Sequence, residues 1–195
     1  MHPRFLGDSY DVVKQSLLGW LGAMGPWSVH PMYAEEPTAR DVEAFEYLLD
    51  VSVVSRAVLG PDTDRRAYFE PARKCEANLF LDPDTGVALG KKARRESPSY
   101  LFADELVEIA QARPHFLTLV FDQSVARGSE RQQLDTKLSF LGARGLSGLA
   151  YVSHACFLLL GTDVSAVEKA TQLVRQKSRL PATRFIERAA AEHGA

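Results

Sequence analysis

The sequence lacks several features that would assign it to a common class of protein. Only two of its 195 residues are cysteines, Cys75 and Cys156, and they are far apart in the chain. This disfavours a Cys-x-x-Cys zinc site and favours two reduced thiols over a disulfide. No apolar run approaches the roughly 20 residues that span a bilayer, and the first residues lead into no apolar signal segment. We therefore expect a cytoplasmic protein with no membrane partner.

Several nucleotide-binding and hydrolase motifs are missing as well. The chain has no glycine-rich phosphate loop with lysine and Ser/Thr, no G-x-G-x-x-G after a strand and no nucleophile elbow. These absences disfavour ATP hydrolysis at a Walker site, NAD chemistry and α/β-hydrolase chemistry. The net charge of -2 provides no global attraction to nucleic acid or anionic lipid.

What is present is an alternation of helix-like and strand-like segments, which is typical of an α/β layer fold. Helices are predicted from Ser9 to about Leu21, from Ala39 as far as Leu59, from Ser97 to about Ala112, from Ser129 towards Gly145, and over residues 165–177. Strands are predicted over Trp27–Tyr33, Asn78–Leu81, Phe116–Phe121, Leu149–Val152 and Cys156–Leu160. Residues 61–76 are expected to be irregular, and the tail after Pro181 weakly helical. The prediction is one domain over residues 1–195, a three-layer Rossmann-like α/β fold with a mainly parallel sheet and an antiparallel edge pair.

The segment Asp82-Pro83-Asp84-Thr85-Gly86 directly follows an apolar strand. Ligands of open α/β sheets bind beyond the carboxyl ends of the strands, where Asp82 and Asp84 could hold Mg²⁺ or orient a polar substrate. The competing interpretation is a simple turn, because Pro-Asp-Thr-Gly suits chain reversal. That turn would form a β-hairpin over Phe80–Leu89.

A second polar segment, Phe121-Asp122-Gln123-Ser124, ends the next predicted strand. Two apolar strands joined by one helix form a right-handed parallel crossover, so Asp82 and Asp122 are expected at the same edge of adjacent strands. Ser124 would lie close by, and Arg127 is a plausible anion contact. The alternative is a polar loop that only caps the next helix.

Two histidines and one lysine also bear on the site. His154, between the last two strands, could serve as an acid or base, or could simply belong to a hairpin turn. His30 precedes a proline at the end of an early strand and could face the same edge as Asp82. Lys14 lies on the turn above Tyr10 and Asp11 near a capped helix start, which predicts an ordinary solvated pair unless the fold buries it.

Basic residues gather in the loop after the Asp82 segment, which holds Lys91, Lys92, Arg94 and Arg95. Others precede the strand, namely Arg65, Arg66, Arg73 and Lys74, and aromatic residues are interleaved with both groups. Such a patch could hold phosphates while the aromatic rings stack on bases. The alternative is a solvated loop. In either case the loop is expected to be exposed and mobile.

Residues 78–161 resemble the C-terminal half of a Rossmann-like methyltransferase and are most similar to three-Cys-motif partner proteins. In that group a strand ends in Asp-Pro-aromatic-Gly, and a helix and an apolar strand follow. Here Leu79-Phe80-Leu81-Asp82-Pro83, Glu105-Leu106-Val107-Glu108-Ile109-Ala110 and the strand from Leu117 to Asp122 occur in that order. The resemblance implies a Rossmann-like fold and S-adenosylmethionine chemistry.

The candidate first strand is followed by Ala34-Glu35-Glu36-Pro37, without the glycine that lets a backbone approach this cofactor. S-adenosylmethionine is therefore a weaker expectation than Mg²⁺ at Asp82 and Asp84. The first hypothesis is a degenerate methyltransferase-like protein that binds or acts on nucleic acid. The alternatives are a Mg²⁺-dependent phosphoesterase or nuclease and a non-catalytic adaptor. The predicted catalytic residues are Asp82, Asp84, Asp122, Ser124 and His154, and the predicted phosphate-binding residues are Lys91, Lys92, Arg94, Arg95 and Arg127.

Overall fold

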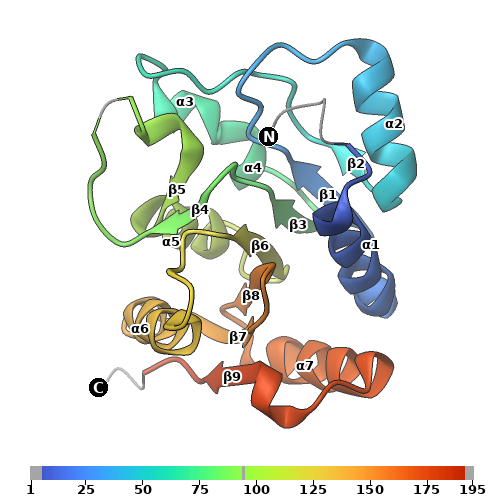
Figure 1. The fold of residues 1–195 in the computed structure, drawn as a ribbon, viewed down its shortest axis with the longest axis vertical. Helices are drawn as coiled ribbons and strands as arrows, with labels where there is room; N and C mark the ends of the chain where they lie inside the picture. The colour runs from blue at the N-terminus through green and yellow to red at the C-terminus, as the bar shows by residue number, and fades with distance from the viewer. Residues whose placement is uncertain (1–5, 94, 192–195) are drawn as a thin grey trace.

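The computed structural model describes residues 6–93 and 95–191, and within them the strands form a seven-stranded sheet and a separate two-stranded sheet (Figure 1). The large sheet has the order β2-β1-β3-β6-β8-β7-β9. Its strands are β1 (Trp27–His30), β2 (Ser52–Val53), β3 (Asn78–Leu81), β6 (Thr118–Asp122), β7 (Ser147–Tyr151), β8 (Cys156–Gly161) and β9 (Phe185–Arg188), and the small sheet pairs β4 (Gly86–Ala88) with β5 (Tyr100–Phe102). The helices are α1 (Ser9–Leu21), α2 (Ala39–Leu49), α3 (Arg65–Tyr68), α4 (Glu70–Arg73), α5 (Ala103–Gln111), α6 (Glu130–Gly142) and α7 (Val164–Ser178), with short 3-10 turns at Gly22–Met24, Ser97–Ser99 and Ala182–Arg184. None of the helices in these residues is long and apolar enough to cross a membrane.

The sheet has a parallel half and an antiparallel half. β2, β1, β3 and β6 pair in parallel, whereas β8 runs antiparallel to both β6 and β7, and β9 runs antiparallel to β7. The predicted three-layer α/β class is confirmed. The antiparallel region is larger than predicted because the tail is a strand, so the expectation of a weakly helical tail was wrong. Phe185 and Ile186 of β9 are buried in the two opposite cores, as alternating strand residues are.

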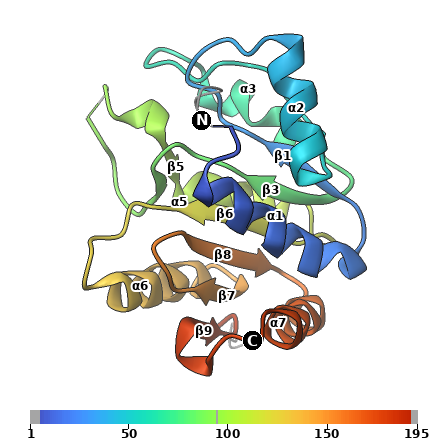
Figure 2. The same ribbon diagram turned by 45° about the vertical axis from the view of Figure 1, so that its right-hand side comes forward.

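Two hydrophobic cores lie on the two faces of the sheet. Phe80 and Leu119 point into one core with apolar residues of α1, α2 and α7. Their neighbours Leu81 and Val120 point into the other with residues of α5 and α6. Figure 2 shows α1 in front of the sheet and α5 behind it. Because a core covers each face of the sheet, every residue of β3 and β6 is buried, which explains their continuous apolar runs.

Two predicted helix boundaries were wrong for local reasons. α2 ends at Leu49 because Asp50 adopts a left-handed conformation (φ 53°), and the β-branched residues after it form β2 instead of more helix. Residues 97–102, predicted as the first turns of a helix, form a 3-10 turn and then β5, so α5 begins only at Ala103. The segment 61–76, expected to be irregular, contains the short helices α3 and α4.

The hairpin interpretation of the Asp82 segment is wrong. β4 pairs in parallel with β5 and packs against the end of β6. The backbone N–H of Gln123 donates to the Thr85 carbonyl over 2.9 Å, and the N–H of Val87 donates to Asp122 Oδ1 over 3.2 Å. Gly86 has φ +130°, and a Cβ atom there would lie 2.2 Å from Asp122 Oδ1. Only glycine therefore fits where the Asp-Thr-Gly turn crosses Asp122.

Replacing Gly86 with alanine should destabilise the protein. The added methyl group would collide with Asp122, and the backbone conformation is unfavourable for alanine, so we expect a loss of about 2 kcal/mol or more. Thermal unfolding should show a decrease in Tm of roughly 4–8 °C. Gly90→Ala is the matched control, because nothing lies within 4 Å of a Cβ atom at Gly90. Equal Tm values for the two variants would contradict this account of the turn.

Candidate functional site

Asp82 and Asp122 lie at the same edge of the sheet, as predicted. β3 and β6 are adjacent and parallel, with Leu81 opposite Val120, so the residues that follow both strands meet at their carboxyl ends. Both aspartates are almost fully buried, with exposed fractions of 1% and 0%. A buried carboxylate needs a compensating charge and hydrogen bonds. Each aspartate obtains them from a lysine on a different helix.

The first aspartate is bound by Lys14 of α1. The Lys14 Nζ lies 3.0 Å from Asp82 Oδ2 and 2.9 Å from Asp11 Oδ1, and only 5% of the lysine is exposed. Lys14 also lies over the Phe121 ring, 4.8 Å from its centroid. The Asp11–Lys14 pair is therefore the buried alternative and not the solvated one, because Asp82 binds the lysine in the interior. We call Asp11, Lys14 and Asp82 the Lys14 cluster.

The charges of the Lys14 cluster do not cancel, because two carboxylates share one ammonium group. Burial raises the pKa of Asp82, although the adjacent Lys14 opposes that shift. Burial by itself would lower the pKa of Lys14, but the attraction of Asp82 and Asp11 outweighs it and raises that pKa. Both pKa values shift upwards, as expected in a buried cluster with excess negative charge, because that charge favours the protonated form of each group. Lys14 is thus a permanent cation at neutral pH.

The second aspartate is bound by Lys137 of α6, which sequence reasoning missed. The Lys137 Nζ lies 2.6 Å from Asp122 Oδ2 and 2.7 Å from Ser124 Oγ. Ser124 Oγ is also 2.7 Å from Asp122 Oδ1 and 2.8 Å from the Val87 carbonyl oxygen. We call Asp122, Ser124 and Lys137 the Lys137 cluster. It joins α6, the end of β6 and β4.

A serine beside a lysine is the geometry of a nucleophile and its base in some hydrolases. In such a pair the amine must accept the proton of the hydroxyl. Here Lys137 donates to a buried carboxylate, and the Ser124 hydroxyl has further contacts with Asp122 and Val87. The Lys137 cluster is therefore arranged to hold the strand end in place, and the arrangement gives Ser124 no activating base.

The two predicted metal ligands lie in different environments. Asp82 is buried and paired with Lys14, whereas Asp84 is exposed. Among residues 6–93 and 95–191, no group of three or more His, Cys, Asp or Glu side chains is placed to hold a metal ion. A Mg²⁺ ion at Asp82 would have to displace the Lys14 ammonium. Metal binding at Asp82 and Asp84 thus stays a prediction with an identified competitor.

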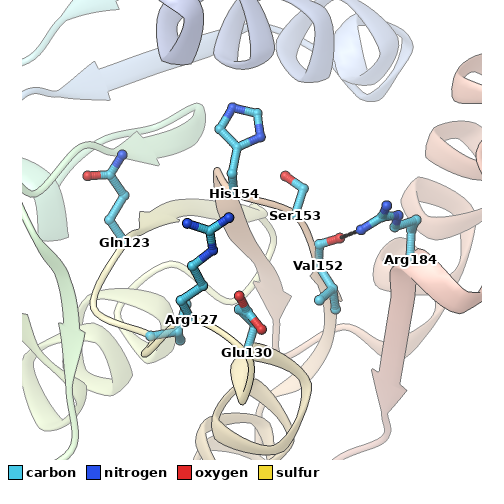
Figure 3. Close-up of a pocket in the computed structure, with 8 residues that line it drawn as sticks. Gln123, Arg127, Glu130, Val152, Ser153, His154 and Arg184 are labelled. Carbon is cyan, nitrogen blue, oxygen red and sulfur yellow. Dashed lines mark hydrogen bonds between the residues drawn. The ribbon is translucent and has the colours of Figure 1, made fainter.

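A cleft of about 480 Å³ opens beyond the Lys137 cluster (Figure 3). It is lined by Gln123, Val125, Arg127, Glu130, Val152, Ser153, His154 and Arg184. The cleft brings together two residues that the sequence singled out, Arg127 and His154. It also adds Arg184, which lies in the tail and donates to the Val152 carbonyl over 3.4 Å. His154 is exposed, and its ring centroid is 5.6 Å from that of Tyr10 on α1.

His30 does not belong to this cleft. It ends β1 with no exposed surface and packs against the rings of Tyr68 and Phe69, at centroid distances of 4.8 and 5.5 Å. Burial lowers its pKa to about 4, so the imidazole is neutral near neutral pH. His30 is a core residue here, and an acid–base role at the strand edge is not supported by its position.

The predicted basic patch lies mainly in the loop after β4. Lys91, Lys92 and Arg95 are exposed, as expected, and Lys92 lies over the Tyr100 ring at 4.7 Å from its centroid. Arg94 lies outside the described residues. Of the four upstream residues, Arg65 pairs with Glu105, Arg73 and Lys74 pair with Glu70, and Arg66 is exposed. We call residues 90–93 and 95–97 the basic loop. Its mobility remains a prediction.

Neither models of known protein families nor curated proteins match this chain. The two free thiols at Cys75 and Cys156 form no disulfide within the described residues.

Lys14→Met should lower the free energy of unfolding by about 3–5 kcal/mol, because it leaves two buried carboxylates without a cation. Denaturant unfolding at pH 7 measures this loss. Lys74→Met is the matched control: Lys74 also pairs with a glutamate, but its side chain is 75% exposed, so its loss should change stability little.

The stability of the wild type relative to Lys14→Met should also depend on pH. Because the folded-state pKa of Lys14 is raised, its contribution is complete below the ordinary lysine value of about 10.5 and is lost as pH rises through the raised value. The stability difference between wild type and Lys14→Met should thus be constant from roughly pH 7 to 10 and shrink above about pH 10.5. A difference that grows in this alkaline range would contradict the assignment.

Proposed function

We propose that this protein is a methyltransferase-like Rossmann protein that binds nucleic acid at the carboxyl edge of its sheet and does not use S-adenosylmethionine. The sheet supports the family resemblance beyond the Asp-Pro motif. After β6, the chain forms α6, β7, a turn and β8, and β8 inserts antiparallel between β6 and β7. The helix, strand, turn and strand that close a methyltransferase sheet follow the same order.

The observation that carries the nucleic-acid proposal is the difference in exposure between the acidic and basic groups at this edge. Asp82 and Asp122 are buried and each is paired with a lysine. By contrast, Lys91, Lys92 and Arg95 are exposed and form no ion pair within the described chain. The basic loop also holds the exposed Glu96, so its three described cations outnumber its one carboxylate and the loop surface is positive despite the net charge of -2. A phosphate backbone suits such a surface, and Tyr100 beneath Lys92 offers an aromatic platform.

The turn after β1 weighs against S-adenosylmethionine. Met32 adopts a left-handed conformation (φ 49°), which glycine favours, and its side chain is 1% exposed in the core. The neighbouring Tyr33 is also buried, and burial raises its pKa to about 12. Side chains therefore fill the space beside this turn, where a cofactor would need close backbone contact.

The alternatives remain distinguishable from the proposal. A Mg²⁺-dependent phosphoesterase or nuclease requires Asp82 to exchange Lys14 for the metal, which the closed Lys14 cluster disfavours. A non-catalytic adaptor is the outcome if nucleic acid does not bind.

The free thiols support a cytoplasmic location, because thiols stay reduced there.

Removing the cations of the basic loop should weaken nucleic-acid binding. The variant Lys91→Ala/Lys92→Ala/Arg95→Ala should bind a 12-nucleotide single strand more weakly, and its log–log salt slope should fall by up to about 2. Fluorescence anisotropy titrations between 50 and 200 mM salt measure the affinity and its salt slope. Over this range, affinity that depends on phosphate contacts changes strongly.

The control for the basic-loop variant is Arg40→Ala/Lys169→Ala/Lys177→Ala, which removes the same charge from exposed positions on α2 and α7. It should keep the affinity and the salt slope of the wild type. Binding that is absent in the wild type, or equally salt-dependent in both variants, would overturn the nucleic-acid proposal.

Calorimetric titration with S-adenosylmethionine should show no micromolar binding, because Met32 and Tyr33 fill the turn after β1 and Lys14 occupies Asp82. Mg²⁺ and Mn²⁺ should likewise bind weakly to the wild type. They should bind more tightly to Lys14→Met if the lysine is their competitor. A micromolar dissociation constant for S-adenosylmethionine would restore the methyltransferase activity that the resemblance implies.

A further inference from the structure

We infer that the cleft between Arg127, His154 and Arg184 binds the terminal phosphate monoester of a nucleic-acid strand. This inference rests on the proposed nucleic-acid function and adds a specific element to it. The basic loop would hold the phosphate backbone without sequence preference, whereas the cleft would recognise an end of the strand.

The first support is the geometry of the cleft. The Arg127 guanidinium group and the His154 ring point into the same space, and Gln123 lies to one side with its amide directed upwards (Figure 3). Arg184 stands on the opposite wall, where one nitrogen donates to the Val152 carbonyl. A guanidinium group has five donors, so this bond leaves Arg184 with others for a ligand. Planar guanidinium groups also match the oxygens of a phosphate.

The second support is the charge balance. Arg127 and Arg184 form no ion pair among the described residues, while Glu130 is the acidic residue of the lining. The Gly128 N–H donates to Glu130 Oε2 over 2.9 Å, and this bond lowers the pKa of Glu130. Two guanidinium groups against one carboxylate give a positive cleft. A phosphate monoester carries about −1.5 to −2 charges and a diester about −1, so the cleft favours the monoester.

The third support is the position of the cleft relative to the basic loop. Val87 of β4 is held by Asp122 and Ser124, the basic loop begins shortly after β4, and Arg127 follows Ser124 by three residues. Three residues span at most roughly 10 Å. Figures 1 and 2 show the green loop after β4 and the yellow segment before α6 on the same, left-hand side of the sheet. A nucleic-acid strand that lies along the basic loop can therefore place its end in the cleft. The cleft volume of about 480 Å³ is within the range of pockets that hold one small ligand.

The test compares three forms of one 12-nucleotide single strand: with a 5′-phosphate, with a 3′-phosphate, and with hydroxyl groups at both ends. We expect the wild type to bind one phosphorylated form about tenfold more tightly than the hydroxyl form, the gain of one charge-assisted contact. Arg127→Ala/Arg184→Ala should bind the three strands with equal affinity, because the preference for a terminal phosphate rests on these two arginines. The basic-loop variant should bind all three more weakly but keep the ratio.

The outcomes separate the inference from the proposed function. Equal affinity of the wild type for all three strands would overturn the terminal-phosphate site and leave nucleic-acid binding intact. No binding of any strand would overturn the proposed function itself. A preference that survives in Arg127→Ala/Arg184→Ala would show that the end is recognised elsewhere. Arg127→Ala alone covers the case in which loss of the Arg184 bond to Val152 unfolds the protein, and it should reduce the preference by itself.

Discussion

The carboxyl edge of this protein depends on the neutralisation of two buried aspartates by two lysines. Asp82 and Asp122 end adjacent strands, and their lysines come from opposite faces of the sheet, Lys14 from α1 and Lys137 from α6. Burying such charges is costly, so these pairs are weak evidence of extra stability, but breaking either leaves an uncompensated charge in the core. The pairs therefore define where α1 and α6 lie relative to the strand ends.

The same interaction determines the electrostatics of the surface above it. Once both aspartates are buried and paired, the exposed charges of Lys91, Lys92, Arg95 and Arg127 face a ligand without those two carboxylates competing. It also determines which chemistry the edge disfavours. Carboxylates with a lysine against them are poor metal ligands until that lysine moves, and a serine held by Lys137 and Asp122 is a poor nucleophile. The arrangement is better suited to binding than to catalysis.

Several parts of the fold were predictable because local chemistry determined them. The capping box of α2 and the apolar strands β3, β6 and β8 occur where the pattern indicated. The parallel pairing of β3 with β6 followed from one connecting helix. The errors arose where tertiary contacts override turn preferences. Asp-Thr-Gly suits a hairpin, but the contact of Gly86 with Asp122 sends β4 to pair with β5. β9 is a strand because β7 offers it an open edge.

By itself the sequence determined the α/β class, the two aspartates at one edge and the exposure of the basic loop, because each depends on local pattern or on a short crossover. Only the tertiary structure decided which lysine meets which aspartate. One signal was present: Lys14 lies in the apolar stripe of its helix with Leu17 and Leu21, and Lys137 in that of Leu134 and Leu141. A lysine in such a stripe indicates a buried partner. Which residue that partner is depends on contacts between residues far apart in the chain, and no local pattern encodes such contacts. The same holds for Arg184, which lies across the cleft from Arg127.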